Sequence, residues 1–184
     1  MTNYIFHSED TAPEKAQAVL ADAKTQLGFV PNLYAGLANA PAALDAYMSL
    51  SDHFGKSSLK PIEQQVVLLV TSIENGCEFC VAAHSLIAKK MVMVPEEIVN
   101  ALREGSLPDD SKLAALAEFT RAVVLERGWV KDHPSFQAFL DAGYQPEQAL
   151  DVVLGATQKT LSNYANHLLE TPLNEAFVGE RWSK

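Results

Sequence analysis

The chain has 184 residues, 48% of them hydrophobic, and its 14 basic and 23 acidic side chains give a formal net charge of −9. This length supports a core without a stabilising disulfide or metal ion, and we expect a single domain over residues 1–184. An acidic protein repels phosphate backbones, which argues against nucleic-acid binding. The sequence starts without the basic and apolar regions of a signal peptide, and its longest aliphatic run, 66–70, is too short for a bilayer. We therefore expect a cytoplasmic protein that binds no membrane.

Apolar residues at helical spacing dominate the chain, and no stretch of useful length alternates as a strand does. The first helix is expected to begin with a capping box, Thr11 to Glu14, and to end before Gly28, with 29–33 as a connector. An aspartate at 109 or 110 is expected to cap a later helix. Further helices are expected over about 41–55, 61–74, 77–90, 95–104, 110–127, 134–142 and 146–169. The predicted fold class is therefore all-α.

The sequence contains one weak internal repeat. Residues 94–102, which begin Val-Pro-Glu-Glu, resemble residues 145–153, which begin Gln-Pro-Glu-Gln. Each is a Pro-Glu helix start after a turn, so the bundle is composed of two similar helical halves or uses the same helix-start chemistry twice. Both interpretations stay open at this point.

The chain has two cysteines, Cys77 and Cys80, and His84 follows them on the same predicted helix. Residues three and four apart are neighbours on a helix, with Cβ atoms roughly 5–6 Å apart, so the three side chains share one face. A disulfide needs a Cβ separation of about 3.5–4.5 Å, which a small adjustment supplies. The Asn75-Gly76 break places Cys77 at the helix N-terminus, where a thiolate is favoured. With His84 able to take a proton from a thiol or to stabilise its anion, the arrangement indicates a dithiol redox site.

The cysteine pair has two other interpretations. Zinc binding would use Cys77, Cys80 and His84, with Glu74 as a fourth ligand, but structural zinc sites usually draw ligands from two segments, and no second Cys or Cys/His pair exists here. Two cysteines that merely pack in the core are the other alternative. We therefore expect neither a metal ion nor a cofactor.

The Cys-x-x-Cys-x-x-x-His motif resembles that of AhpD-like proteins in the carboxymuconolactone decarboxylase superfamily. The segments 29–32, 59–70 and 161–167 are also similar, the last to a branch labelled peroxidase-related, so the resemblance covers about 29–173. It implies an AhpD-like helical bundle, assembled as a trimer or hexamer, that acts as an antioxidant peroxidase on organic hydroperoxides or exchanges disulfides. It further implies that Cys80 attacks the peroxide, Cys77 closes the disulfide, His84 relays protons, and a dithiol reductant such as a lipoyl protein resets the pair.

One position departs from the family pattern. The family commonly has a glutamate twelve residues before the first cysteine, where this chain has Gln65. An amide orients a histidine or a water but accepts no proton at neutral pH. Loss of a general base typically costs about 10²–10⁴-fold in rate. Glu74, one turn before Cys77, is a possible substitute, whereas Glu63 lies on a different helical face.

Three functions are therefore left open. The first is a thiol peroxidase or disulfide oxidoreductase that uses Cys80, Cys77 and His84. The second is a non-catalytic redox sensor or interaction protein, which the presence of Gln65 favours. The third is a carboxymuconolactone decarboxylase-type lyase, a branch that generally lacks the cysteine pair.

Overall fold

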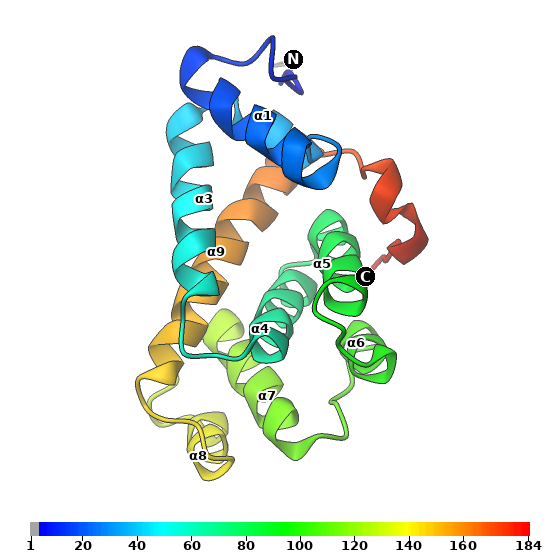
Figure 1. Ribbon diagram of the computed structural model, residues 1–184. Coiled ribbons are helices and arrows are strands. Elements are labelled where there is room, and N and C mark those ends of the chain that lie inside the picture. The colour runs from blue at the N-terminus through cyan, green and yellow to red at the C-terminus, as the bar shows by residue number, and fades with distance from the viewer. Residues whose placement is uncertain (1–3) are drawn as a thin grey trace.

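The structure, a computed structural model, describes residues 4–184, and residues 1–3 of the domain expected over 1–184 lie outside the described part. It is an all-α bundle, which confirms the predicted fold class (Figure 1). Between residues 4 and 184 there is no strand, and no helix is long and apolar enough to cross a membrane. The elements are α1 (Glu14–Leu27), α2 (Asn32–Leu37), α3 (Pro41–Gly55), α4 (Pro61–Glu74), α5 (Glu78–Lys90), α6 (Glu96–Arg103), α7 (Ser111–Leu125), α8 (Pro134–Asp141), α9 (Gln148–Leu169) and the 3₁₀ helix η1 (Glu175–Glu180).

Helix α4 lies at the centre of the bundle and packs against α5, α6, α7 and α9. Every residue from Gln65 to Ile73 is buried, in keeping with the aliphatic run 66–70 that leaves the helix apolar on most sides. Its C-terminal end leads directly into α5, so the central helix fixes the position of the cysteine pair.

Helix α9 buries polar side chains and exposes apolar ones, the reverse of an ordinary surface helix. Lys159, Ser162 and Asn166 are buried, whereas Leu150 and Leu168 are 71% and 68% exposed. The helix lies alongside α3 and also packs on α4 (Figure 1). Because buried polar groups need partners, the inward face of α9 indicates a polar site within the bundle.

A glycine permits this close packing of α9. A Cβ added at Gly155 would lie 2.6 Å from the ring of Phe54 and 2.8 Å from Val67, both of which are buried. Gly55, the last residue of α3, has no atom within 4 Å of the same added group. Alanine gains helix propensity at both positions, but only Gly155→Ala crowds the core.

We expect Gly155→Ala to be less stable than Gly55→Ala by about 1–3 kcal/mol in the free energy of unfolding, which is the usual cost of overpacking. Urea denaturation of the two variants beside the parent chain measures this difference. Equal stabilities would show that the α3–α9 contact adjusts to an extra methyl group.

The predicted helix starts are correct in part. Asp110 caps α7 by accepting hydrogen bonds from the backbone N–H groups of Lys112 and Leu113, as expected. The capping box at Thr11 is wrong, because α1 begins after Pro13 with no side-chain cap and Thr11 Oγ1 instead accepts from the backbone N–H of Ser8 at 2.9 Å. The proline supplies the start by its fixed φ, so the serine-threonine turn precedes the helix rather than opening it.

The structure contains two short helices that the sequence analysis did not predict. Helix α2 occupies part of the expected connector, and η1 follows α9. Each has six residues, too few for an apolar period to show. The two segments of the internal repeat lie at the starts of α6 and α9, which have 8 and 22 residues. This difference in helix length favours common helix-start chemistry over two similar halves.

Candidate dithiol site

Cys77 is the N-cap residue of α5, and Cys80 and His84 follow on that helix, so the three motif residues take the predicted positions. The chain reverses between α4 and α5 through Gly76, whose φ of +68° is one that glycine adopts without strain. Both cysteines are buried and free. The short turn between α4 and α5 therefore fixes the position of the two cysteines.

A cavity of about 480 Å³ lies beside this pair. Cys80 and His84 line it, whereas Cys77 does not. The walls are mainly apolar and aromatic, with contributions from Leu33, Tyr34, Tyr47, Phe54, Leu68, Phe79, Ile87 and Phe177. A small molecule with an apolar body that enters this cavity therefore meets the sulfur of Cys80 first.

Three residues of the inward face of α9 surround the Cys80 sulfur. Asn166 Nδ2 donates to Cys80 Sγ at 3.2 Å and lies 3.6 Å from Cys77 Sγ, so one amide joins both sulfurs. Ser162 Oγ lies 3.7 Å and Lys159 Nζ 3.8 Å from Cys80 Sγ. Sequence reasoning missed all three, although polar residues at 159, 162 and 166 recur at helical spacing.

The pKa values of the two thiols are shifted in opposite directions. Burial alone raises the pKa of Cys80, but the hydrogen bond from the Cys77 thiol, the Lys159 charge and Ser162 outweigh it and lower that pKa below its ordinary value. The hydrogen bond to Cys80 and burial raise the pKa of Cys77. The helix N-terminus was expected to favour a thiolate at Cys77; instead the lowered pKa belongs to Cys80, which favours the thiolate there, with Cys77 as its hydrogen-bond donor.

His84 is held by two partners at its two ring nitrogens. Its Nδ1 lies 3.1 Å from Gln65 Oε1, an atom that can only accept, so Nδ1 carries the proton. Nε2 therefore accepts from Lys159 Nζ at 2.7 Å. Burial and the Lys159 charge lower the pKa of His84, which keeps the ring neutral. Gln65 thus orients the histidine, as an amide can, and Lys159 lies between that ring and Cys80.

Residues 34–122 match the carboxymuconolactone decarboxylase family, and this range includes the complete motif from Cys77 to His84. The segment 34–122, just under half of the chain, is therefore similar to this family. The resemblance read from the motif is thereby confirmed. A search of curated proteins gives no significant match.

Several solved structures share this fold. An alkylhydroperoxidase AhpD core, a peroxidase-related protein from Ralstonia eutropha, aligns with a TM-score of 0.84 at 22% identity over 99% of this chain and 97% of that one. A peroxidase-related protein from a Silicibacter species gives 0.80 at 17% identity over 97% and 96%. A cysteine-to-alanine variant of the debrominase Bmp8, in complex with 2,3,4-tribromopyrrole, gives 0.80 at 17% identity over 98% and 95%. These TM-scores establish a common fold.

The structure does not bring Glu74 to the dithiol. Its carboxylate accepts from Arg121 Nε at 2.7 Å on α7, and it is not among the residues that line the cavity. Glu63 is also turned away, since it accepts from the backbone N–H of Lys60 at 2.7 Å and from the hydroxyl of Tyr144. Neither glutamate replaces the family carboxylate, because both are engaged in structural pairs on the far side of α4. The zinc interpretation loses its fourth ligand for the same reason.

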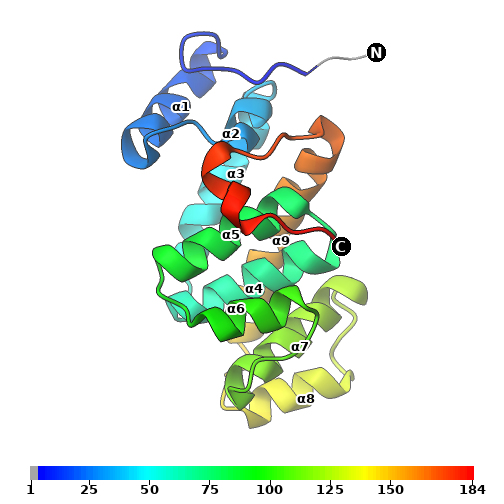
Figure 2. The same cartoon turned by 90° about the vertical axis from the view of Figure 1, so that its right-hand side faces the viewer.

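The segment after α9 closes one wall of the cavity. Figure 2 shows η1 lying across α5. Its Phe177 lines the cavity and meets Phe79 edge to face at a ring separation of 5.7 Å. Glu180 pairs with Lys89 at 3.0 Å, and Arg103 donates to the Glu180 carbonyl at 3.0 Å. Long-range contacts thus hold the wall in place over the cysteines.

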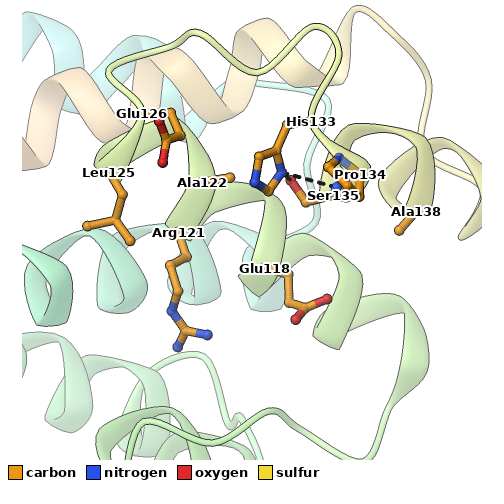
Figure 3. A pocket seen from close by; sticks show the side chains of 9 residues that line it. All are labelled: Glu118, Arg121, Ala122, Leu125, Glu126, His133, Pro134, Ser135 and Ala138. Atoms are coloured by element: carbon orange, nitrogen blue, oxygen red, sulfur yellow. Dashed lines mark hydrogen bonds between the residues drawn. The ribbon is translucent and has the colours of Figure 1, made fainter.

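A second depression lies between α7 and α8, away from the dithiol (Figure 3). Arg121 and His133 are among the side chains that line it. His133 Nδ1 lies 2.8 Å from Ser135 Oγ and accepts from the Ser135 backbone N–H at the start of α8. Arg121 pairs with Glu74 of α4, and His133 caps the start of α8, so both side chains have structural roles.

Proposed function

We propose that the chain is a dithiol oxidoreductase that reduces organic hydroperoxides, with Cys80 as the attacking thiolate and Cys77 as the resolving thiol. One observation carries this proposal: of the two thiols, the one whose pKa is lowered is the one that lines the cavity. The thiolate is the nucleophilic form of cysteine, so the thiol that ionises more readily is also the one that a substrate in the cavity can reach.

Two steps account for the reaction. Cys80 attacks the terminal oxygen of the hydroperoxide, the O–O bond breaks, and Cys80 sulfenic acid and an alcohol form. Cys77 then attacks the sulfenic sulfur, and a disulfide and water result. The sum is one hydroperoxide and one dithiol converted to one alcohol, one water and one disulfide. Asn166, which lies near both sulfurs, supports their approach.

The disulfide must be reduced for turnover, and we propose a dithiol donor such as a protein-bound dihydrolipoyl group. Such a donor attacks the Cys77–Cys80 bond and leaves as its own disulfide. Reduced donors of this kind belong to a reducing compartment, which supports a cytoplasmic location. The aromatic walls favour a substrate with an apolar body over hydrogen peroxide.

Consumption of an organic hydroperoxide by pre-reduced protein with a dihydrolipoyl donor tests the proposal. We expect sustained turnover, and equal turnover from Glu74→Gln, because that carboxylate pairs with Arg121 outside the cavity. One round of oxidation without turnover would instead support a redox sensor. A pair that no oxidant reaches would favour the lyase.

A second candidate is the reductive removal of a halogen from an aromatic ring. A buried cation, Lys159, lies beside Cys80 in a cavity with aromatic walls, and it would pair with the anion that forms when an acidic N–H or O–H on such a ring loses its proton. One aryl bromide and the dithiol would give the debrominated ring, bromide, a proton and the disulfide. Release of bromide from a bromopyrrole or bromophenol by pre-reduced protein distinguishes this reaction from peroxide reduction.

We also propose that the chain assembles as a homo-oligomer, the trimer or hexamer that the resemblance implies. The exposed apolar side chains of α9 support this assembly. Leu150, Tyr164 and Leu168 are each more than 60% exposed on one helix. A second copy of the chain would remove them from water.

A further inference from the structure

The Lys159 side chain is a buried cation with an unusual set of neighbours. It is 1% exposed, and no carboxylate lies within ion-pair distance of it among residues 4–184. Within the described part of the chain no aspartate or glutamate lines the cavity, and burial raises the pKa of the lining residues Tyr34 and Tyr47, which keeps them neutral. A buried ammonium is costly unless it is paired. The anion within reach is the Cys80 thiolate, at 3.8 Å.

The reaction proposed above removes this counter-charge. When Cys80 becomes a sulfenic acid, its negative charge passes to the alkoxide that leaves, and the ammonium loses its partner. Transfer of a proton from Lys159 to the alkoxide neutralises both groups at once. Gln65 cannot supply that proton through His84, because the pair carries one N–H···O hydrogen bond and no acidic group.

We propose that Lys159 is the catalytic proton donor of the site, which protonates the leaving alkoxide as Cys80 attacks the hydroperoxide. This role rests on the proposed function. His84 Nε2, at 2.7 Å from Lys159 Nζ, accepts one of its N–H groups and positions the amine beside the sulfur. His84 is thus a positioning residue, and Lys159 is the group that acts on the reacting atoms.

The protons balance over the cycle. The reduced site holds a Cys80 thiolate, a Cys77 thiol and an ammonium, and the first step gives sulfenic acid, alcohol and a neutral amine. In the second step the proton of Cys77 leaves with the sulfenic hydroxyl as water. The dithiol donor then returns two protons, one to Cys77 and one to Lys159.

The test compares two oxidants on each protein in single-turnover oxidation of the reduced dithiol. tert-Butyl hydroperoxide releases a strongly basic alkoxide that needs a proton, whereas peracetic acid releases a weakly basic carboxylate that does not. For Lys159→Met we expect the ratio of the two rates, alkyl hydroperoxide over peracid, to fall by about 10²–10⁴-fold, the usual contribution of a general acid. The ratio cancels any change in the thiolate fraction of Cys80, which slows both oxidants equally.

Lys159→Arg is the second variant, because arginine keeps the charge but does not give up its proton. It should react with peracetic acid like the parent and remain slow with tert-butyl hydroperoxide. An unchanged ratio in Lys159→Met, or full alkyl hydroperoxide reduction by Lys159→Arg, would overturn the role of Lys159 while leaving the dithiol mechanism in place. A parent chain that neither oxidant oxidises would instead remove the proposed function itself, and the role of Lys159 with it.

Discussion

Replacing Cys80 by serine is expected to reduce hydroperoxide consumption to the uncatalysed rate. The variant keeps the volume and a hydroxyl at the position that lines the cavity, but a serine hydroxyl is not ionised there and does not attack the O–O bond. The remaining thiol, Cys77, does not line the cavity, so it does not take over the first step. Full activity in Cys80→Ser would exclude the mechanism.

Cys77→Ser is the matched control, because it removes the second thiol and leaves the first. We expect one equivalent of hydroperoxide to be consumed per chain, with Cys80 trapped as a sulfenic acid that dimedone labels. Mass spectrometry of the labelled chain measures the trapped product. Sustained turnover in this variant would mean that an external thiol resolves the sulfenic acid directly and that Cys77 is dispensable.

Alkylation of Cys80 is expected to persist at pH values where an ordinary cysteine is unreactive. The pKa of Cys80 is lowered by the Cys77 hydrogen bond, the Lys159 charge and Ser162 against the opposing effect of burial, so its thiolate survives as pH falls below the ordinary value. In Cys77→Ser, Cys80 is the one thiol left and a hydroxyl remains to donate to it. The iodoacetamide rate of this variant should have its midpoint below about 8.5, the value for a free cysteine.

Cys80→Ser provides the opposite case in the same experiment. The hydrogen bond to Cys80 and burial raise the pKa of Cys77 in the parent, and burial remains in this variant, so alkylation of Cys77 should begin only above the ordinary value. Two midpoints on opposite sides of the free-cysteine value would establish the division of charge between the sulfurs. A Cys80 midpoint at or above that value would contradict the thiolate–ammonium pair.

The motif and the fold class follow from local information. Cys77, Cys80 and His84 share one helix, so their common face is fixed by a spacing that can be read directly. The aliphatic run before them requires burial on most sides, which places α4 at the centre. These features need no knowledge of which helices meet.

The rest of the site depends on contacts between distant segments. Lys159 and Asn166 reach Cys80 from α9, about 80 residues away, and nothing local to either helix specifies that meeting. Glu74 is close to Cys77 in sequence but faces α7, because the end of α4 turns its carboxylate toward Arg121. The inverted polarity of α9 was the available signal, since a helix with buried polar residues must direct them at something polar.

The wall formed by η1 also bears on how the chain is made. Phe177 is translated about 100 residues after Cys80, which at 5–20 residues per second corresponds to roughly 5–20 s of synthesis. Lys159 and Asn166 also emerge after the cysteines, so a nascent chain carries the pair before it has the groups that stabilise the thiolate. During translation both sulfurs are thus ordinary thiols in an open chain, and the reactivity of Cys80 arises only when the later segments dock.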